Sequence, residues 1–205
     1  MQELINKIES LKKSNIKNKI DKRIQEFKSK KSIDEIFKEL CFCILTANFN
    51  AEKSIKIQEK IGDCFLTDKK EELSKKLRKC GHRFPNKRAE YISESSKCRN
   101  KLKEVLKYDN KKAIRDWMVK NIDGIGYKES SHFLRNIGFD DFAIIDFHII
   151  DILSNYKLIK KPKTITKKKY LEIENILKKL AKKTNLTLAE LDLYLWYMET
   201  GKILK

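Results

Sequence analysis

The chain has 205 residues, enough for one domain or two small lobes, and 40% of them are hydrophobic. Its 47 lysines and arginines outnumber 29 aspartates and glutamates, for a net charge of +18, which favours nucleic acid as a partner ahead of an anionic membrane. No apolar run approaches the ~20 residues that span a bilayer, and the polar N-terminus is not a signal peptide. A genome that places lysine at any exposed site is the alternative explanation of the charge.

Few glycines and prolines interrupt the chain, six and two respectively, which is typical of helical proteins. The clearest helix is predicted over residues 32–47, where Ser32 and Glu35 form a capping box before apolar residues at helical spacing. Cys41 and Cys43 fall within that apolar pattern and are predicted to be core residues. Because the five cysteines match neither a zinc pattern nor a disulfide framework, we expect reduced thiols and no metal.

No segment alternates as a strand does, and we expect an all-α fold. Thr187 and Glu190 form a second capping box, before a helix that runs to about Thr200 and stops at Gly201. The lysine-rich residues 160–169 are predicted to form a loop that leads into a helix. Further helices are predicted over residues 3–11, 17–28, 52–61, 69–79, 87–97, 111–120, 127–137, 147–154 and 167–182.

A glycine hairpin, Gly124, Ile125 and Gly126, separates two helical patterns. Glycine permits positive φ and close approach of another backbone, and the N–H groups that begin the next helix form a ready phosphate site. Lys128 lies in the first turn of that helix, where the helix dipole disfavours an ammonium, and a neutral lysine amine is a nucleophile able to form a Schiff base. Taken alone, the hairpin is as consistent with a plain turn, and the lysine with phosphate binding or a solvated side chain.

Asp146 interrupts the apolar run AIIDFHII at residues 143–150. A buried carboxylate needs a partner or a task. Because Asp146 precedes a new apolar helical pattern, we expect it to cap that helix, ionised and partly buried. This position also brings a fixed negative charge near the mouth of the hairpin.

The pairing of GIGYK at 124–128 with IIDFH at 144–148 resembles the motif of the helix–hairpin–helix DNA base-excision glycosylases. Over most of its length, the chain looks like the archaeal-type 8-oxoguanine DNA glycosylase/AP lyases. The resemblance implies a compact all-α enzyme without an iron–sulfur cluster. Such an enzyme excises 8-oxoguanine from double-stranded DNA and cleaves the strand by β-elimination. The segments that carry the resemblance are residues 45–54, 81–92, 126–138 and 191–205.

The resemblance also implies catalytic roles. Lys128 attacks the sugar carbon that bears the damaged base, and Asp146 stabilises the developing positive charge and helps to activate the lysine. His148 matches a position that contacts phosphate near the lesion. Gly124 and Gly126 belong to the hairpin that grips the DNA backbone.

Flipping a base out of the stack leaves a gap that the protein must fill. Phe84, on a predicted loop with basic neighbours, is the candidate wedge, and Arg83 the candidate contact to the orphaned cytosine. A core phenylalanine beside a surface arginine is the alternative. Asn48 matches the position from which relatives present a polar side chain into the duplex, and an ordinary helix C-cap is its alternative.

8-Oxoguanine differs from guanine by a hydrogen on N7 and an oxygen on C8, so an acceptor placed at N7 selects the lesion. The resemblance implies that the terminal Lys205 lines the base pocket. Trp196 is the candidate for stacking on the base, with core packing as its alternative. Two residues depart from the family pattern: Phe147 stands where a basic residue is expected, and Asp123 adds negative charge before the hairpin.

Two other functions remain open: the same fold acting on other oxidised bases, and a non-catalytic helix–hairpin–helix module that binds DNA. The second is disfavoured because gripping phosphate needs no aspartate. The expected architecture has two helical lobes with the hairpin at the cleft between them. Residues 1–30 plus 119–205 form the catalytic lobe, and residues 31–118 form the other. We expect a cytoplasmic monomer, associated with the nucleoid through DNA.

Overall fold

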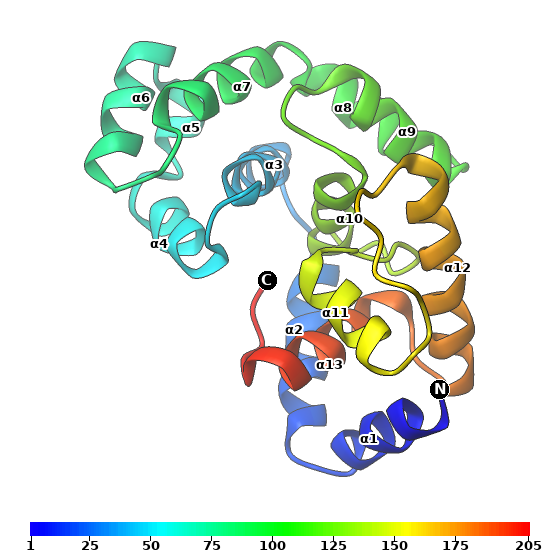
Figure 1. Cartoon of the computed structure of the whole chain (residues 1–205). Helices are drawn as coiled ribbons and strands as arrows, with labels where there is room; N and C mark the ends of the chain where they lie inside the picture. The colour runs from blue at the N-terminus through cyan, green and yellow to red at the C-terminus, as the bar shows by residue number, and fades with distance from the viewer. The chain divides into compact units, whose positions relative to one another are not determined.

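The computed structural model describes residues 1–205, and helices are its only regular secondary structure, as predicted (Figure 1). Their bounds are α1 (Gln2–Lys12), α2 (Ile16–Lys28), α3 (Ile33–Thr46), α4 (Ala51–Ile61), α5 (Cys64–Thr67), α6 (Lys70–Lys79), α7 (Pro85–Lys97), α8 (Arg99–Val105), α9 (Lys111–Asn121), α10 (Tyr127–Asn136), α11 (Phe147–Asn155), α12 (Lys167–Lys183) and α13 (Leu188–Thr200). None of these helices combines the length and the apolar composition that a membrane-spanning segment needs.

Two of these helices, α5 and α8, were not predicted. α5 has four residues, too few for a helical period to show in the sequence. α8 follows α7 with only Cys98 between them, and two buried residues, Leu102 and Val105, hold it to its unit. Such short helices are formed by tertiary packing more than by their own propensity.

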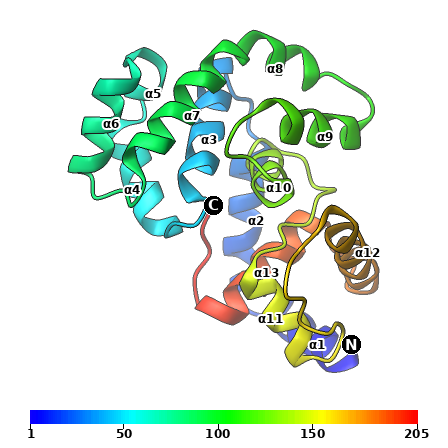
Figure 2. The same ribbon diagram turned by 45° about the horizontal axis from the view of Figure 1, so that its top comes forward.

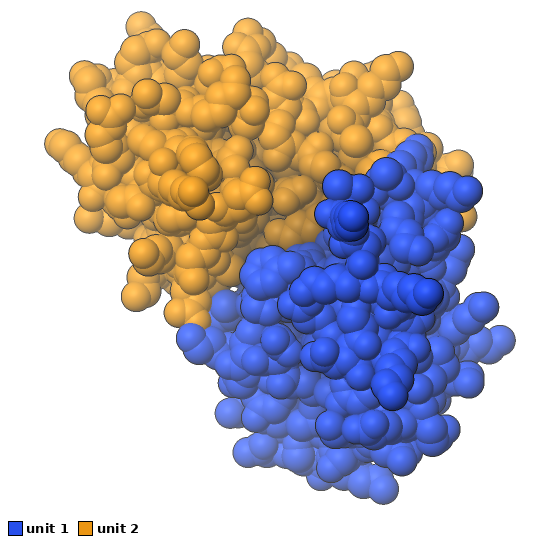
Figure 3. Space-filling view, in the orientation of Figure 1, with its two compact units in different colours: residues 1–29, 134–205 blue, residues 30–133 orange.

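The chain divides into two compact units (Figure 3). Unit 1 comprises Met1–Ser29 and Leu134–Lys205, and unit 2 comprises Lys30–Phe133. The expected division placed residues 119–133 in the other lobe, so the hairpin and the start of α10 fall in a different unit from the one predicted. The physical reason is packing: the Arg115 side chain on α9 donates to Ser131 Oγ of α10 at 3.2 Å.

The buried centre of unit 2 is α3. It begins with the predicted capping box, in which Ser32 Oγ accepts from the Glu35 N–H at 3.2 Å and Glu35 Oε2 accepts from the Ser32 N–H at 2.7 Å. From Leu40 to Leu45 no residue is more than 1% exposed, and α4, α5, α7 and α8 pack against the helix. Cys41 and Cys43 are core residues as predicted, and burial raises the pKa of the Cys41 thiol well above its usual value.

Unit 1 is organised around α13, which packs against α1, α2, α11 and α12; α11 lies beside it in both views (Figures 1 and 2). The predicted capping box at Thr187 and the left-handed stop at Gly201, with φ of 69°, are both confirmed. Arg135 and Asp192 form an ion pair whose side chains are 4% and 10% exposed. Since removing one partner of a buried pair costs about 3–5 kcal/mol, this contact fixes the end of α10 to α13.

Candidate active site

The hairpin lies in unit 2, and its two glycines are under different structural constraints. Gly124 has φ of 76°, the left-handed conformation that glycine tolerates. A Cβ at this position would also lie 2.4 Å from Cδ2 of Tyr91 on α7, closer than real atoms approach. Gly126 does not have positive φ, and a Cβ there would meet only Glu129 Oε2, at 3.2 Å. Gly124 is therefore required twice over, by its backbone conformation and by Tyr91.

The first turn of α10 carries Lys128 beside a carboxylate. The Gly126 N–H donates to Glu129 Oε2 at 3.2 Å, and Lys128 Nζ lies 3.8 Å from Glu129 Oε1. The side chains of Lys128 and Glu129 are 25% and 16% exposed. Glu129 was not singled out from the sequence, although its place three residues after Gly126 is the spacing of a capping box. One carboxylate thus caps the helix and faces the candidate nucleophile.

Asp146, in unit 1, is the N-cap of α11, as predicted. Its Oδ1 accepts from the Ile149 N–H at 3.0 Å, and no hydrogen bond within the protein engages Oδ2. The non-helical residues 143–145 before Asp146 are held by Tyr170 of α12. The Tyr170 hydroxyl donates to the Ala143 carbonyl at 2.7 Å and accepts from the Ile145 N–H at 3.3 Å. The carboxylate is therefore fixed through Oδ1 and leaves Oδ2 for a ligand.

An aromatic cluster follows Asp146. The His148 ring lies edge-on to Trp196, with centroids 4.8 Å apart, and 4.0 Å from the ring of Phe147. His148 Nδ1 is 3.9 Å from Glu199 Oε1, and the buried Nε1 of Trp196 has no hydrogen-bond partner. Unit 1 thus brings His148 and Trp196 together. Phe147, by contrast, is 67% exposed.

Lys205 ends the chain in unit 1, on the non-helical segment that follows Gly201, and it is half-buried. Lys128 and Asp146 belong to different units. The catalytic candidates are therefore divided, with the nucleophile and the hairpin in unit 2 and the carboxylate and the base-recognition candidates in unit 1.

The gap-filling candidates all lie in unit 2. Phe84 is the N-cap residue of α7 and is 37% exposed, so it is not a core residue. The exposed Arg83 holds its guanidinium carbon 4.9 Å from the centre of the Phe84 ring. Asn48, just past α3, is exposed and has φ of 55°, a left-handed conformation that asparagine adopts more readily than most residues.

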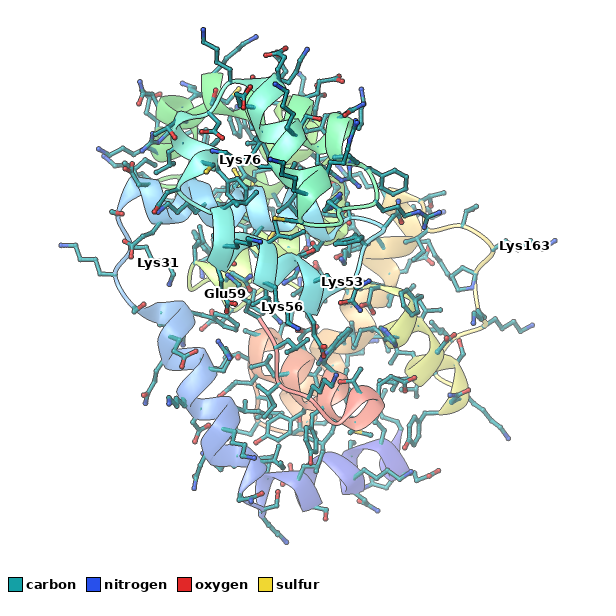
Figure 4. All side chains as sticks on the ribbon, turned by 90° about the vertical axis from the view of Figure 1, so that its left-hand side faces the viewer. Lys31, Lys53, Lys56, Glu59, Lys76 and Lys163 are labelled. Atoms are coloured by element: carbon teal, nitrogen blue, oxygen red, sulfur yellow. The ribbon has the colours of Figure 1, made fainter.

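Several exposed lysine side chains have no acidic partner. Lys53 and Lys56 project from α4, and Lys163 projects from the loop before α12 (Figure 4). Lys76, by contrast, pairs with Asp68 at 2.7 Å. Unpaired exposed lysines are the groups that neutralise phosphates on a polyanion. No group of three or more histidine, cysteine, aspartate and glutamate side chains is placed to hold a metal ion.

Comparisons with known proteins cover most or all of the chain. The family model for 8-oxoguanine DNA glycosylase matches residues 20–186. The Methanocaldococcus jannaschii protein named 8-oxoguanine DNA glycosylase/AP lyase is 58% identical over 98% of this chain and 99% of its own length. A protein of the same name from Korarchaeum cryptofilum is 47% identical, over 100% of this chain and 99% of its own.

Two solved structures also match over nearly the full length of the chain. The Methanocaldococcus jannaschii 8-oxoguanine glycosylase/lyase, in complex with a 15mer DNA containing 8-oxoguanine, has a TM-score of 0.96 at 58% identity, over 98% of this chain and 99% of that chain. The 8-oxoguanine DNA glycosylase of Thermotoga maritima has a TM-score of 0.93 at 42% identity, over 100% and 99% of the two chains. By sequence and by structure, the chain belongs to the 8-oxoguanine DNA glycosylase family.

Proposed function

We propose that this chain is a bifunctional DNA glycosylase/AP lyase, which flips 8-oxoguanine out of double-stranded DNA, excises it and cleaves the strand. The observation that carries the proposal is the position of Lys128, in the first turn of α10 directly after the glycine hairpin and 3.8 Å from a carboxylate. Full-length similarity to a protein named for both activities supports it.

In the proposed reaction Lys128 supplies the nucleophile. The lone pair of its Nζ forms a bond to C1′ of the damaged nucleotide while the bond from C1′ to N9 of the base breaks, and the base leaves with the electron pair. The free Oδ2 of Asp146 stabilises the positive charge that develops on the sugar. Opening of the sugar then gives an imine to Lys128. Loss of a C2′ proton expels the 3′ phosphate, which cleaves the strand.

Residues of unit 2 hold the DNA and fill the gap. Gly124 and Gly126 let backbone phosphate approach the N–H groups that begin α10. Phe84 takes the space of the flipped base, and Arg83 donates to the orphaned cytosine. Asn48 enters the same gap from the end of α3. The exposure of Phe84, Arg83 and Asn48 supports these roles.

Residues of unit 1 recognise the base. Trp196 stacks on 8-oxoguanine, and Lys205, on the segment after Gly201, lines the base pocket where an acceptor meets the hydrogen on N7. Guanine lacks that hydrogen and would leave the acceptor unpaired, and a site of this kind rejects the wrong substrate by about 10⁴-fold. His148 contacts a phosphate beside the lesion. Because Lys128 and Asp146 carry the chemistry, the proposed enzyme needs no cofactor. We further propose that it acts as a monomer on nucleoid DNA in the cytoplasm.

Borohydride trapping tests the proposal. The protein is incubated with a duplex that carries one 8-oxoguanine opposite cytosine, and reduction of the imine is expected to yield a covalent protein–DNA adduct. Lys128→Gln is expected to remove the adduct, while Lys120→Gln, a change of an exposed lysine on α9, retains it. A duplex with thymine glycol tests the other lesions. Tight binding with neither adduct nor cleavage would reject the lyase function and favour a binding module.

A further inference from the structure

The backbones of the two gap-filling segments are joined by one side chain. We call residues 81–84 the wedge loop and residues 45–50 the Asn48 turn. His82 is 4% exposed, its Nε2 lies 3.0 Å from the Leu45 carbonyl oxygen, and its Nδ1 accepts from the Phe84 N–H at 3.0 Å. The ring also packs against Phe49, with centroids 4.2 Å apart. Both nitrogens and one face of the imidazole are thus in use.

These contacts define the protonation state of the ring. A carbonyl oxygen only accepts and a backbone N–H only donates, so both bonds form only when Nε2 carries the hydrogen and Nδ1 carries a lone pair. Burial lowers the pKa of His82, and the charge of Arg88 on α7 adds to this effect, while the Leu45 carbonyl opposes it. His82 is therefore held as a neutral imidazole of defined tautomer.

Arg88 provides a second tie between the same segments. Its guanidinium donates to the Ala47 carbonyl, next to Asn48, and its central carbon lies 5.8 Å from the Phe84 ring and 5.7 Å from the Tyr91 ring. The wedge loop and the Asn48 turn therefore expose their functional side chains while their backbones are bonded to buried groups. Side chains on loops held in this way lose less conformational entropy on binding.

We propose that His82 is a positioning residue: its neutral ring fixes the wedge loop to the Asn48 turn, so that Phe84 and Asn48 enter the duplex as one preformed unit. The inference rests on the proposed gap-filling roles of those two side chains. Without the ring, the Phe84 N–H loses its acceptor, and each segment must be ordered separately when DNA binds.

This role separates two steps of the reaction. Extruding 8-oxoguanine from an intact base pair requires the wedge, since stacking and pairing must be broken. An abasic site has no base to extrude, so attack of Lys128 on a preformed abasic site depends far less on the wedge loop. A change at His82 is therefore expected to slow base excision selectively, whereas a general loss of folding slows both reactions.

Two variants distinguish the bonds of the ring. His82→Gln retains a donor near the Nε2 position but loses the acceptor for the Phe84 N–H, while His82→Asn retains an acceptor near Nδ1 and loses the donor to Leu45. Since an unsatisfied buried group costs about 1–3 kcal/mol, His82→Asn, which breaks the bond between the two segments, is expected to slow single-turnover excision about 10–100-fold. His82→Gln, which keeps that bond and loses only the bond within the wedge loop, is expected to be slowed less, and both variants should cleave preformed abasic duplex at close to the normal rate.

Phe84→Ala is the reference. If it leaves excision unchanged, the gap-filling assignment fails, and this inference fails with it. If Phe84→Ala slows excision while His82→Asn does not, the inference alone is overturned. Equal losses of excision and abasic cleavage in His82→Asn would also overturn it, by showing a structural role only. Selective loss of excision in Phe84→Ala and His82→Asn, with His82→Gln less affected, supports it.

Discussion

Two helix starts carry the catalytic candidates, and they are capped in opposite ways. At α11 the cap is Asp146 itself, whose Oδ1 accepts from the Ile149 N–H. At α10 the N-cap position is Gly126, and Glu129 reaches back from within the helix to its N–H. At α11, Asp146 thus has both the capping role and the chemical role. At α10, Glu129 caps the helix and its neighbour Lys128 has the chemical role. It follows that Lys128 can be changed without loss of a cap, whereas Asp146 cannot be deleted without one.

Asp146 variants test this difference most strongly. Asparagine caps helices about as well as aspartate but carries no charge, so Asp146→Asn is expected to retain stability and lose about 10²–10³-fold in single-turnover excision, as when one electrostatic stabiliser is removed. Asp146→Ala loses the cap as well, which costs a further ~1 kcal/mol of unfolding free energy. Urea denaturation and excision rates measure the two effects. Equal stability of the two variants would show that the cap contributes nothing.

Gly124 tests the hairpin against an internal standard. Gly81 has nearly the same φ, 75°, with open space around its Cβ position, whereas Gly124, at 76°, faces Tyr91. Gly81→Ala is therefore expected to lose only the left-handed backbone term, about 1–2 kcal/mol. Gly124→Ala is expected to lose more, since Tyr91 must also move, and to weaken DNA binding. If the two variants unfold at the same urea concentration, the close approach of Tyr91 is unimportant.

Glu129 tests the second helix start. Glu129→Gln keeps an oxygen for the Gly126 N–H and removes the charge beside Lys128, while Glu129→Ala removes both. The alanine variant is expected to be less stable by about 0.5–1 kcal/mol than the glutamine variant. A shift in the pH profile of adduct formation that is common to both variants would show that the negative charge of Glu129 acts on the Lys128 amine. A shift confined to the alanine variant would instead point to the loss of the cap.

The helix caps depend on residues close together in the chain and can therefore be predicted from the sequence. The capping boxes at Ser32 and Thr187 and the N-cap at Asp146 depend on residues three apart, and all three are present as predicted. The bond between His82 and Leu45 joins residues 37 apart, and no periodicity reports such a pair. The same holds for the packing that assigns residues 119–133 to unit 2, because the few glycines and prolines mark no clear boundary in the sequence.

The smallest effect concerns pH and returns to His82, whose pKa is lowered in the folded protein. Below about pH 6.5 the unfolded chain protonates this histidine while the folded protein does not, so the unfolded state binds more protons and the free energy of unfolding falls as pH falls toward the folded pKa. His82→Asn cannot titrate. Its free energy of unfolding should therefore approach that of the wild type as pH decreases from 7.5 to 5.

The other groups with shifted pKa values do not disturb this comparison. Glu35 and Glu104 have pKa values lowered from 4.5, so their contribution to stability is lost only at more acidic pH and is common to both proteins. In the folded protein, protonation of His82 would place a hydrogen on Nδ1 against the Phe84 N–H, and because the pKa is lowered this bond is lost only at more acidic pH than the stability change. A stability difference between wild type and His82→Asn that stays constant from pH 7.5 to 5 would mean that the buried ring is not held neutral, and the tautomer inferred from its two bonds would be wrong.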